Sequence, residues 1–159
     1  MLVGEQPGDR EDRAGKPFVG PAGRELDRGL EAAGIDRGEA YVTNVVKHFK
    51  FEERGRRRIH ATPKRFEIDA CKPWLEEELR VVRPEALILL GATAAKAILG
   101  SSFRVSKQRG ELLESELAPI VSATIHPSAI LRGPDEATRQ EERAAFAADL
   151  ANVTRALGA

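Results

Sequence analysis

Apolar residues follow two alternating patterns along this chain: short continuous runs, and longer stretches with helical spacing. The short runs, at 1–3, 41–43, 86–90 and 119–125, predict four strands. Helices are expected to begin near Pro21, after Thr62-Pro63, at Ala92 and near Asp135. Strands that alternate with helices pair in parallel and are covered on both faces. The pattern therefore predicts an α/β protein, a three-layer α/β/α sandwich with a central, mainly parallel four-stranded sheet, forming a single domain over 1–159.

The same pattern makes predictions about the core and the connections. The helix after Thr62-Pro63 is expected to turn Phe66, Ala70, Trp74 and Leu75 toward the sheet, and the last helix to bury Phe146, Leu150, Val153 and Leu157. Segment 4–20 is rich in glycine and polar residues, and segment 45–62 is rich in cations, so both predict loops. A hairpin-like region is expected around Gly110.

Composition narrows the class of protein. Of the 159 residues 42% are hydrophobic, which is enough for a core in one domain. No apolar run approaches the roughly 20 residues that span a bilayer, and the first residues enter a strand at once, so we expect neither a membrane segment nor a signal peptide. The single cysteine, Cys71, excludes an internal disulfide and fits a reducing compartment. We expect a monomer in the cytoplasm that does not bind membranes.

Positive charge is concentrated in one segment. Lys+Arg and Asp+Glu both total 25, yet residues 47–65 hold eight cations and two glutamates, a local excess of six positive charges. The neighbouring guanidiniums of Arg56, Arg57 and Arg58 repel one another unless a polyanion neutralises them, and each can bind a phosphate through a planar fork of donors. The segment therefore predicts binding to nucleic acid. A solvated surface loop is the alternative.

Three polar residues stand directly after predicted strands: Glu5 after the first, Asn44 after the second and His126 after the last. In parallel α/β sheets, ligands bind in the crevice outside the carboxyl ends of the strands. Their common location predicts a site.

Each candidate side chain has a functional and a structural interpretation. Phe18 could stack on a base or anchor its loop as a hydrophobic plug. Asn44 could match the O4 and N3–H edge of uracil, or stabilise a turn. His126 could donate a hydrogen bond to a developing anion, or be a structural histidine, and His60 could be an ordinary surface residue. The residue types alone leave these alternatives open.

Five motifs occur together and in order. They are Gly4-Glu5-Gln6-Pro7-Gly8, Lys16-Pro17-Phe18-Val19-Gly20-Pro21-Ala22-Gly23, Thr43-Asn44-Val45-Val46-Lys47, Arg57-Arg58-Ile59-His60 and His126-Pro127-Ser128. Together they resemble the uracil-DNA glycosylase superfamily near family 4, over nearly the whole chain. The Arg-Arg-Ile-His segment resembles the UdgX-type branch of that superfamily.

The resemblance implies that uracil is flipped out of single- or double-stranded DNA and excised during base excision repair. It assigns uracil contacts to Gln6, Asp9, Phe18 and Asn44, and phosphate contacts to Arg56, Arg57, Arg58 and Ser128. His126 would stabilise the departing uracil anion. His60, oriented by Glu5, would attack C1′ and leave a covalent adduct, because a neutral imidazole is a stronger nucleophile than water. The alternatives are a hydrolytic, multiple-turnover glycosylase and a non-catalytic binding remnant.

The resemblance also implies a 4Fe-4S cluster. Cys71 and His48 match two of its ligands, and imidazole can ligate iron. The other two belong to a Cys-x-x-Cys pair upstream of the first strand, which this sequence does not contain. Two ligands do not hold a cluster, so we expect either a start further upstream, which we favour, or loss of the cluster.

Overall fold

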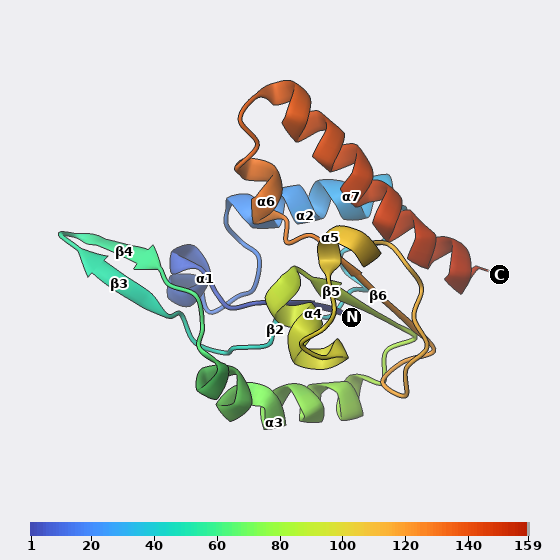
Figure 1. Cartoon of the computed structure of the whole chain (residues 1–159), viewed down its shortest axis with the longest axis horizontal. Coiled ribbons are helices and arrows are strands. Elements are labelled where there is room, and N and C mark those ends of the chain that lie inside the picture. Colours follow the sequence, from blue (N-terminus) through green and yellow to red (C-terminus); the bar gives the residue numbers. More distant parts are fainter. Residues whose placement is uncertain (159) are drawn as a thin grey trace.

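The computed structural model describes residues 1–158 and contains a four-stranded sheet in the order β2-β1-β5-β6 (Figure 1). Its strands are β1 (Leu2–Gly4), β2 (Val42–Asn44), β5 (Ala86–Leu90) and β6 (Ile120–Thr124). Every pairing between them is parallel. The four predicted strands are confirmed, each within one residue of its expected bounds.

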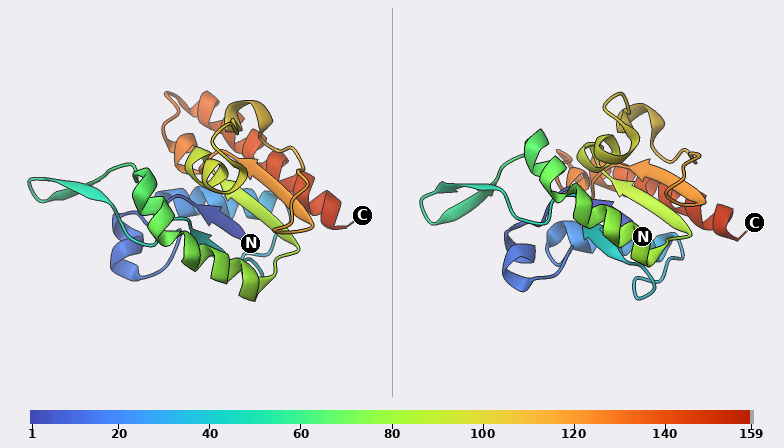
Figure 2. Two further views of the ribbon diagram at one scale, coloured as in Figure 1. Left: turned by 60° about the horizontal axis from the view of Figure 1, so that its bottom comes forward. Right: turned by 90° about the horizontal axis from the view of Figure 1, so that it is seen from below.

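Helices cover both faces of this sheet (Figure 2). One layer contains α2 (Pro21–Ala32), α6 (Ser128–Leu131) and α7 (Glu136–Leu157), and the other contains α3 (Arg65–Val82), α4 (Ala92–Leu99) and α5 (Val105–Gln108). Successive side chains of a strand point to opposite faces. In β5, Ile88 and Leu90 therefore pack with the first layer, while Leu87 and Leu89 pack with the second. The predicted three-layer α/β/α sandwich is confirmed.

Three of the four expected helix starts are correct, at Pro21, at Ala92 and directly after Asp135. Pro21 occupies the first position of α2, where its missing N–H has no helical partner to lose. Asp135 precedes α7, and its carboxylate accepts a 2.7 Å hydrogen bond from the backbone N–H of Thr138. Among the described residues, no helix is long and apolar enough to cross a membrane.

Helix α3 differs from its prediction. It begins at Arg65, two residues after the expected proline, with Lys64 as its N-cap. Cys71 and Leu75 are buried, but Phe66 and Trp74 are exposed, and so is Ala70. At 100° per residue, the stripe of residues 66, 70 and 74 lies about 120° around the helix from the buried face. The α3 segment therefore carries two apolar stripes, and the prediction treated them as one.

Both predicted loops contain regular structure. Segment 4–20 includes the short helix α1 (Asp9–Ala14), and segment 45–62 includes a two-stranded antiparallel hairpin, β3 (Phe51–Arg54) and β4 (Arg57–His60). Gly55 allows the tight turn because its φ is 60°. The charged strands of this hairpin hide the alternation that usually marks β structure. Near Gly110, the expected hairpin is limited to one antiparallel bridge between Leu113 and Val121.

Helices α2 and α7 pack closely around one buried charge. A Cβ atom on Gly29 would lie 2.5 Å from the Phe146 ring, so glycine permits the approach of the two helices. Glu25 on α2 is only 3% exposed, and Arg143 of α7 donates to both of its oxygens, at 2.9 and 3.1 Å. Hydrogen bonding from Arg143 lowers the pKa of Glu25, so this carboxyl stays ionised.

The α7 core contacts give a matched test of stability. Leu150 is fully buried, so Leu150→Ala is expected to lower the free energy of unfolding by about 3 kcal/mol through lost burial and a new cavity. Leu157, which the sequence placed on the same stripe, is 47% exposed, and Leu157→Ala should cost under about 1 kcal/mol. Urea unfolding measures both, and equal losses would contradict the assigned packing of α7.

Candidate active site

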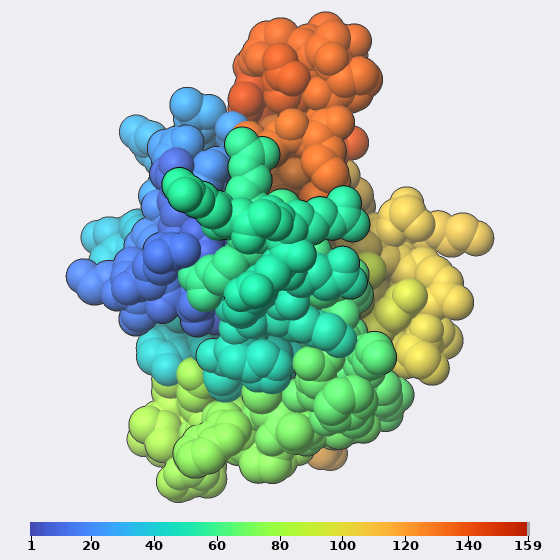
Figure 3. Space-filling view, turned by 90° about the vertical axis from the view of Figure 1, so that its left-hand side faces the viewer, coloured from blue at the N-terminus to red at the C-terminus, as the bar shows by residue number. Residues whose placement is uncertain are grey.

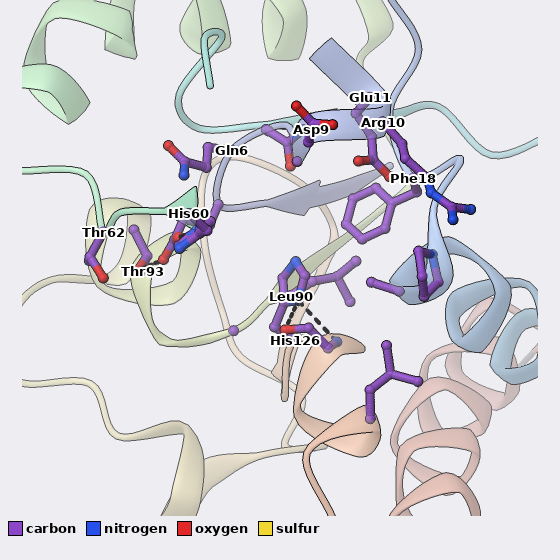
Figure 4. Close-up of a pocket in the computed structure, with 18 of the residues that line it drawn as sticks. Gln6, Asp9, Arg10, Glu11, Phe18, His60, Thr62, Leu90, Thr93 and His126 are labelled. Carbon is purple, nitrogen blue, oxygen red and sulfur yellow. Dashed lines mark hydrogen bonds and ion pairs between the residues drawn. The ribbon is translucent and has the colours of Figure 1, made fainter. Parts of the chain in front are cut away.

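The carboxyl ends of the parallel strands open into a cavity of about 790 Å³. Glu5, Asn44 and His126, which the sequence analysis expected to share a site, all line this cavity. Figure 4 shows His60 on one side of it, and Phe18 and His126 together on another. Leu90, at the end of β5, lines it too, so the cavity combines the end of the hairpin with the ends of all four strands of the sheet.

His60 is the last residue of β4, and its side chain lines the cavity. Its Nε2 lies 2.9 Å from Oε1 of Glu5. The other carboxylate oxygen, Oε2, accepts a hydrogen bond from the hydroxyl of Thr93 in α4. The His60 side chain is 51% exposed and that of Glu5 only 20%, so the carboxylate is the more enclosed member of the pair. A half-exposed imidazole is thus held at the mouth of the cavity.

Gln6 joins both ends of the hairpin to the first loop. Its Nε2 donates to the carbonyl oxygens of Lys50 and Ala61, at 3.2 and 3.1 Å, and its Oε1 accepts from the Lys50 N–H at 3.1 Å. The residue is 8% exposed. The uracil contact expected of Gln6 would have to compete with these three bonds, which fix where the hairpin leaves the body of the protein.

Arg58 holds the hairpin against α1. Its guanidinium pairs with Asp9 at 2.5 Å and with Asp12 at 2.6 Å, and it stacks over the rings of Phe49 and Phe51 at 5.3 and 5.0 Å. These partners already bind the Arg58 guanidinium, which was expected to bind a phosphate. They also occupy Asp9, a residue expected to contact uracil. In the structure, the ion pair between Arg58 and Asp9 links the hairpin to α1.

The remaining hairpin arginines face solvent. Alternation along β4 puts Arg58 and His60 on one face of the ribbon and Arg57 on the other. Arg56 lies in the turn, and both Arg56 and Arg57 are exposed. Figure 3 shows the hairpin projecting over the middle of this side of the molecule, next to the N-terminal segment. Phosphate binding stays a prediction for Arg56 and Arg57.

Two glycines make room for Phe18 in the cavity wall. Phe18 has the unusual φ of 52°, and a Cβ on Gly23 would lie 1.9 Å from its carbonyl oxygen. A Cβ on Gly4 would lie 2.7 Å from its ring and 2.6 Å from Oδ1 of Asn44. The Phe18 ring is 8% exposed and stacks on His126 with centroids 5.5 Å apart. The glycines therefore bring an aromatic face and an amide side by side.

Asn44 presents an unused acceptor. The residue is 6% exposed, and its Oδ1 is buried without a hydrogen-bond partner among residues 1–158. Its backbone carbonyl is fixed by Nζ of Lys47, which donates to it at 2.6 Å. A buried, unpaired amide oxygen costs free energy unless a ligand satisfies it. This atom is therefore placed to meet a donor from outside the protein.

His126 is held as a neutral ring with its free nitrogen in the cavity. The backbone N–H of Ser128 donates to Nδ1 at 3.2 Å, so Nδ1 is the acceptor and Nε2 carries the proton. Nδ1 also lies 2.8 Å from the Ser128 hydroxyl oxygen, which accepts from Arg132 at 3.1 Å. Burial lowers the pKa of His126 to about 4. Ser128, expected to contact phosphate, supports His126 here.

Among the lining residues that the sequence did not single out, three form side-chain hydrogen bonds at the cavity. They are Thr93, which binds Glu5; Glu11, whose Oε1 accepts from the Gly20 N–H at 2.7 Å; and Arg132. Thr93 follows the end of β5 by three residues, so the strand-end rule that found the other candidates would have found it too. Glu11 lies in α1 and Arg132 directly follows α6, two short helices that the sequence did not predict.

Cys71, on the buried face of α3, lies next to His48, which belongs to the segment after β2. The Cys71 sulfur is 3.9 Å from Nδ1 of His48 and accepts the Lys47 N–H at 3.4 Å. Within residues 1–158, no group of three or more His, Cys, Asp or Glu could hold a metal ion. The pair fits two positions of a four-ligand iron–sulfur site, and this part of the chain does not complete the set.

A sequence model of the uracil DNA glycosylase superfamily matches residues 1–151, so the chain belongs to that superfamily. Among its relatives, the type-4 uracil-DNA glycosylase of Pyrobaculum aerophilum is 37% identical over 141 residues, covering 84% of this chain and 68% of the relative. The type-4 enzyme of Sulfurisphaera tokodaii is 36% identical, covering 85% and 62%. That of Thermotoga maritima is 35% identical, covering 88% and 70%. The chain thus spans about two thirds of each relative.

Burial of His126 gives a prediction about pH. Its pKa is about 4 in the folded protein against about 6.5 in an unfolded chain, so the unfolded state binds more protons between these values. The contribution of His126 to stability is complete above pH 6.5 and is lost as pH falls toward 4. Between pH 7.5 and 4.5, the wild type should lose roughly 2 kcal/mol more stability than His126→Gln. Urea unfolding at both pH values measures this, and equal losses in the two proteins would disprove it.

Proposed function

We propose that this chain excises uracil from DNA and remains covalently bonded, through His60, to the sugar that loses the base. The observation that carries this proposal is the position of His60. Its imidazole is hydrogen-bonded to Glu5 at 2.9 Å, in the same cavity as Phe18, Asn44 and His126. Membership of the uracil DNA glycosylase superfamily supports the excision step. The hairpin supports the covalent step, because it delivers a nucleophile to the cavity.

Uracil recognition follows from the two side chains that the glycines bring together. A nucleotide flipped out of the stack can lay its base against the Phe18 ring. The unpaired Oδ1 of Asn44 accepts the N3–H of uracil, and the Asn44 amide N–H donates to O4. Cytosine presents a bare N3 and an amine at these two places, so one acceptor would face an acceptor and one donor would face a donor. Selectivity for uracil arises from this mismatch.

His126 stabilises the leaving group. When the bond between C1′ and the base breaks, its electron pair leaves with uracil as an anion. The neutral His126 ring donates its Nε2–H to a uracil oxygen, where negative charge develops. Because Ser128 already fixes the other nitrogen, the donor needs no reorientation during the reaction. The sugar is left with an electron-poor C1′.

His60 then captures the sugar. A ring nitrogen gives its lone pair to C1′ and forms the new C–N bond, while the proton on the other ring nitrogen passes to the Glu5 carboxylate. The adduct is therefore neutral, and uracil is the only group expelled. An imidazole held beside the reacting carbon has a high effective concentration, which favours capture over attack by water. An alkylated imidazole leaves poorly, so each protein acts once.

A denaturing gel tests the covalent step. Incubation with uracil-containing single-stranded DNA should give a heat-stable, shifted band in amounts that never exceed the protein added. His60→Ser should abolish this band, while the control Arg80→Ser, an exposed position outside the cavity lining, should retain it. Survival of the band in His60→Ser would mean that the nucleophile is another residue.

Two other outcomes would replace the proposal. Free abasic DNA in excess over the protein would indicate a hydrolytic, multiple-turnover glycosylase in which His60 positions water. Binding without base release, at any protein concentration, would indicate a protein that only binds DNA. The same gel, combined with alkaline cleavage of abasic sites, distinguishes both from covalent capture.

We also propose Cys71 and His48 as two ligands of an iron–sulfur cluster, which would stabilise this part of the fold. Because a 4Fe-4S cluster takes four ligands, residues 1–159 alone are expected to hold far less than four irons per chain after anaerobic reconstitution. Iron and sulfide analysis measures this. Four irons per chain would show that further ligands lie within this stretch, and an unchanged iron content in Cys71→Ser would remove Cys71 from the set.

A further inference from the structure

The Glu5 carboxylate is shared between two elements that approach it from different directions. Its Oε1 faces Nε2 of His60 at 2.9 Å, and its Oε2 accepts the Thr93 hydroxyl. Figure 4 shows Thr93 and His60 next to each other on one side of the cavity. The two oxygens thus have separate partners, one from the hairpin and one from α4.

The helix itself does not use the Thr93 hydroxyl. Thr93 lies in the first turn of α4, where no preceding helical turn offers a carbonyl, and its hydroxyl donates to Glu5 instead. Thr93 is the second residue of α4, which follows the N-cap Gly91. The backbone of Gly91 has φ 94°, and a Cβ there would lie 2.9 Å from Cβ of His126. The turn that places Thr93 therefore also contacts the leaving-group histidine.

The geometry makes Thr93 control the direction of the carboxylate. A carboxylate with one bonded oxygen loses the freedom to rotate about its last side-chain bond, so its second oxygen points in a fixed direction. The His60 side chain is 51% exposed and has few restraints of its own. The partially positive first turn of α4 also favours a negative charge at this place.

From these contacts we propose that Thr93 is a positioning residue. Its hydroxyl holds one oxygen of Glu5 so that the other orients His60 for attack on the sugar. This inference rests on the proposed function, because it names what aligns the nucleophile of that reaction. Thr93 itself touches neither the base nor the sugar in this scheme.

Kinetics with a matched set of variants tests the positioning role. Thr93→Val keeps the shape and removes the hydroxyl, and should slow adduct formation about tenfold at saturating protein, as expected for losing one hydrogen bond to a charged group. Affinity for uracil-containing DNA should change less than twofold. Thr93→Ser should recover the rate to within about threefold of wild type. Thr138→Val, the same substitution in the first turn of α7, should leave it unchanged.

A spectroscopic measurement tests the same inference without DNA. The chain has three histidines, so His60 can be assigned by its loss in His60→Ser. Two-bond correlations between ring nitrogens and carbon-bound ring protons report which nitrogen carries the proton. One tautomer, with the proton on Nε2, should dominate in wild type and Thr93→Ser, and a mixture should appear in Thr93→Val. If Thr93→Val does not fold, Thr93→Ala takes its place in both experiments.

The outcomes separate this inference from the proposed function. A wild type that forms no adduct would refute covalent capture, and the tautomer of His60 would still decide the role of Thr93. A Thr93→Val protein with the wild-type adduct rate and an unchanged His60 spectrum would overturn the positioning role. A tenfold slower rate in both Thr93→Val and Thr93→Ser would also overturn it, because the serine variant keeps the hydroxyl.

Discussion

The hydrogen bond between Glu5 and His60 joins segments separated by 55 positions in the sequence, and the chemistry proposed for the cavity depends on it. One partner is fixed by the sheet, since Glu5 directly follows the central strand β1. The other is at the end of a hairpin that projects from the body and makes few core contacts. Keeping the two groups at 2.9 Å therefore requires restraints on the hairpin. Gln6 supplies them at its base, and Arg58 supplies them along its length.

The two histidines of the cavity differ in burial, and this difference suits them to different proposed roles. His126 is only partly exposed, and burial lowers its pKa to about 4, so the ring stays neutral and its Nε2–H is available as a donor. His60 is half exposed and hydrogen-bonded to a carboxylate, which suits the proposed nucleophile, since that ring must give up a lone pair and then a proton. A buried donor needs a fixed tautomer, whereas a nucleophile needs access to the substrate. The fold places His126 at a strand end and His60 on a hairpin, in keeping with the two proposed roles.

Much of the fold followed from the sequence, because the strands are short apolar runs and the helix starts carry local signals at Pro21 and Asp135. The shared cavity of Glu5, Asn44 and His126 followed from one rule about parallel sheets. The hairpin did not, because its exposed strands are charged on both faces and bury no apolar stripe. The predicted orientation of α3 was wrong for the opposite reason: Phe66 and Trp74 form an apolar stripe that is exposed to solvent in the structure. Contacts such as Arg58 with Asp9 depend on tertiary approach, which residue patterns do not encode.

The arginine run illustrates how a charge pattern can mix two functions. Three consecutive cations suggested a uniform phosphate clamp, but strand alternation separates them by face. Arg58 turns inward and is neutralised by Asp9 and Asp12, while Arg57 turns outward and keeps its charge available. Internal pairing also resolves part of the repulsion that had argued for an external polyanion. In the proposed reaction, the hairpin approaches DNA with its outer face while its inner face keeps His60 on Glu5, so substrate binding need not disturb the proposed nucleophile.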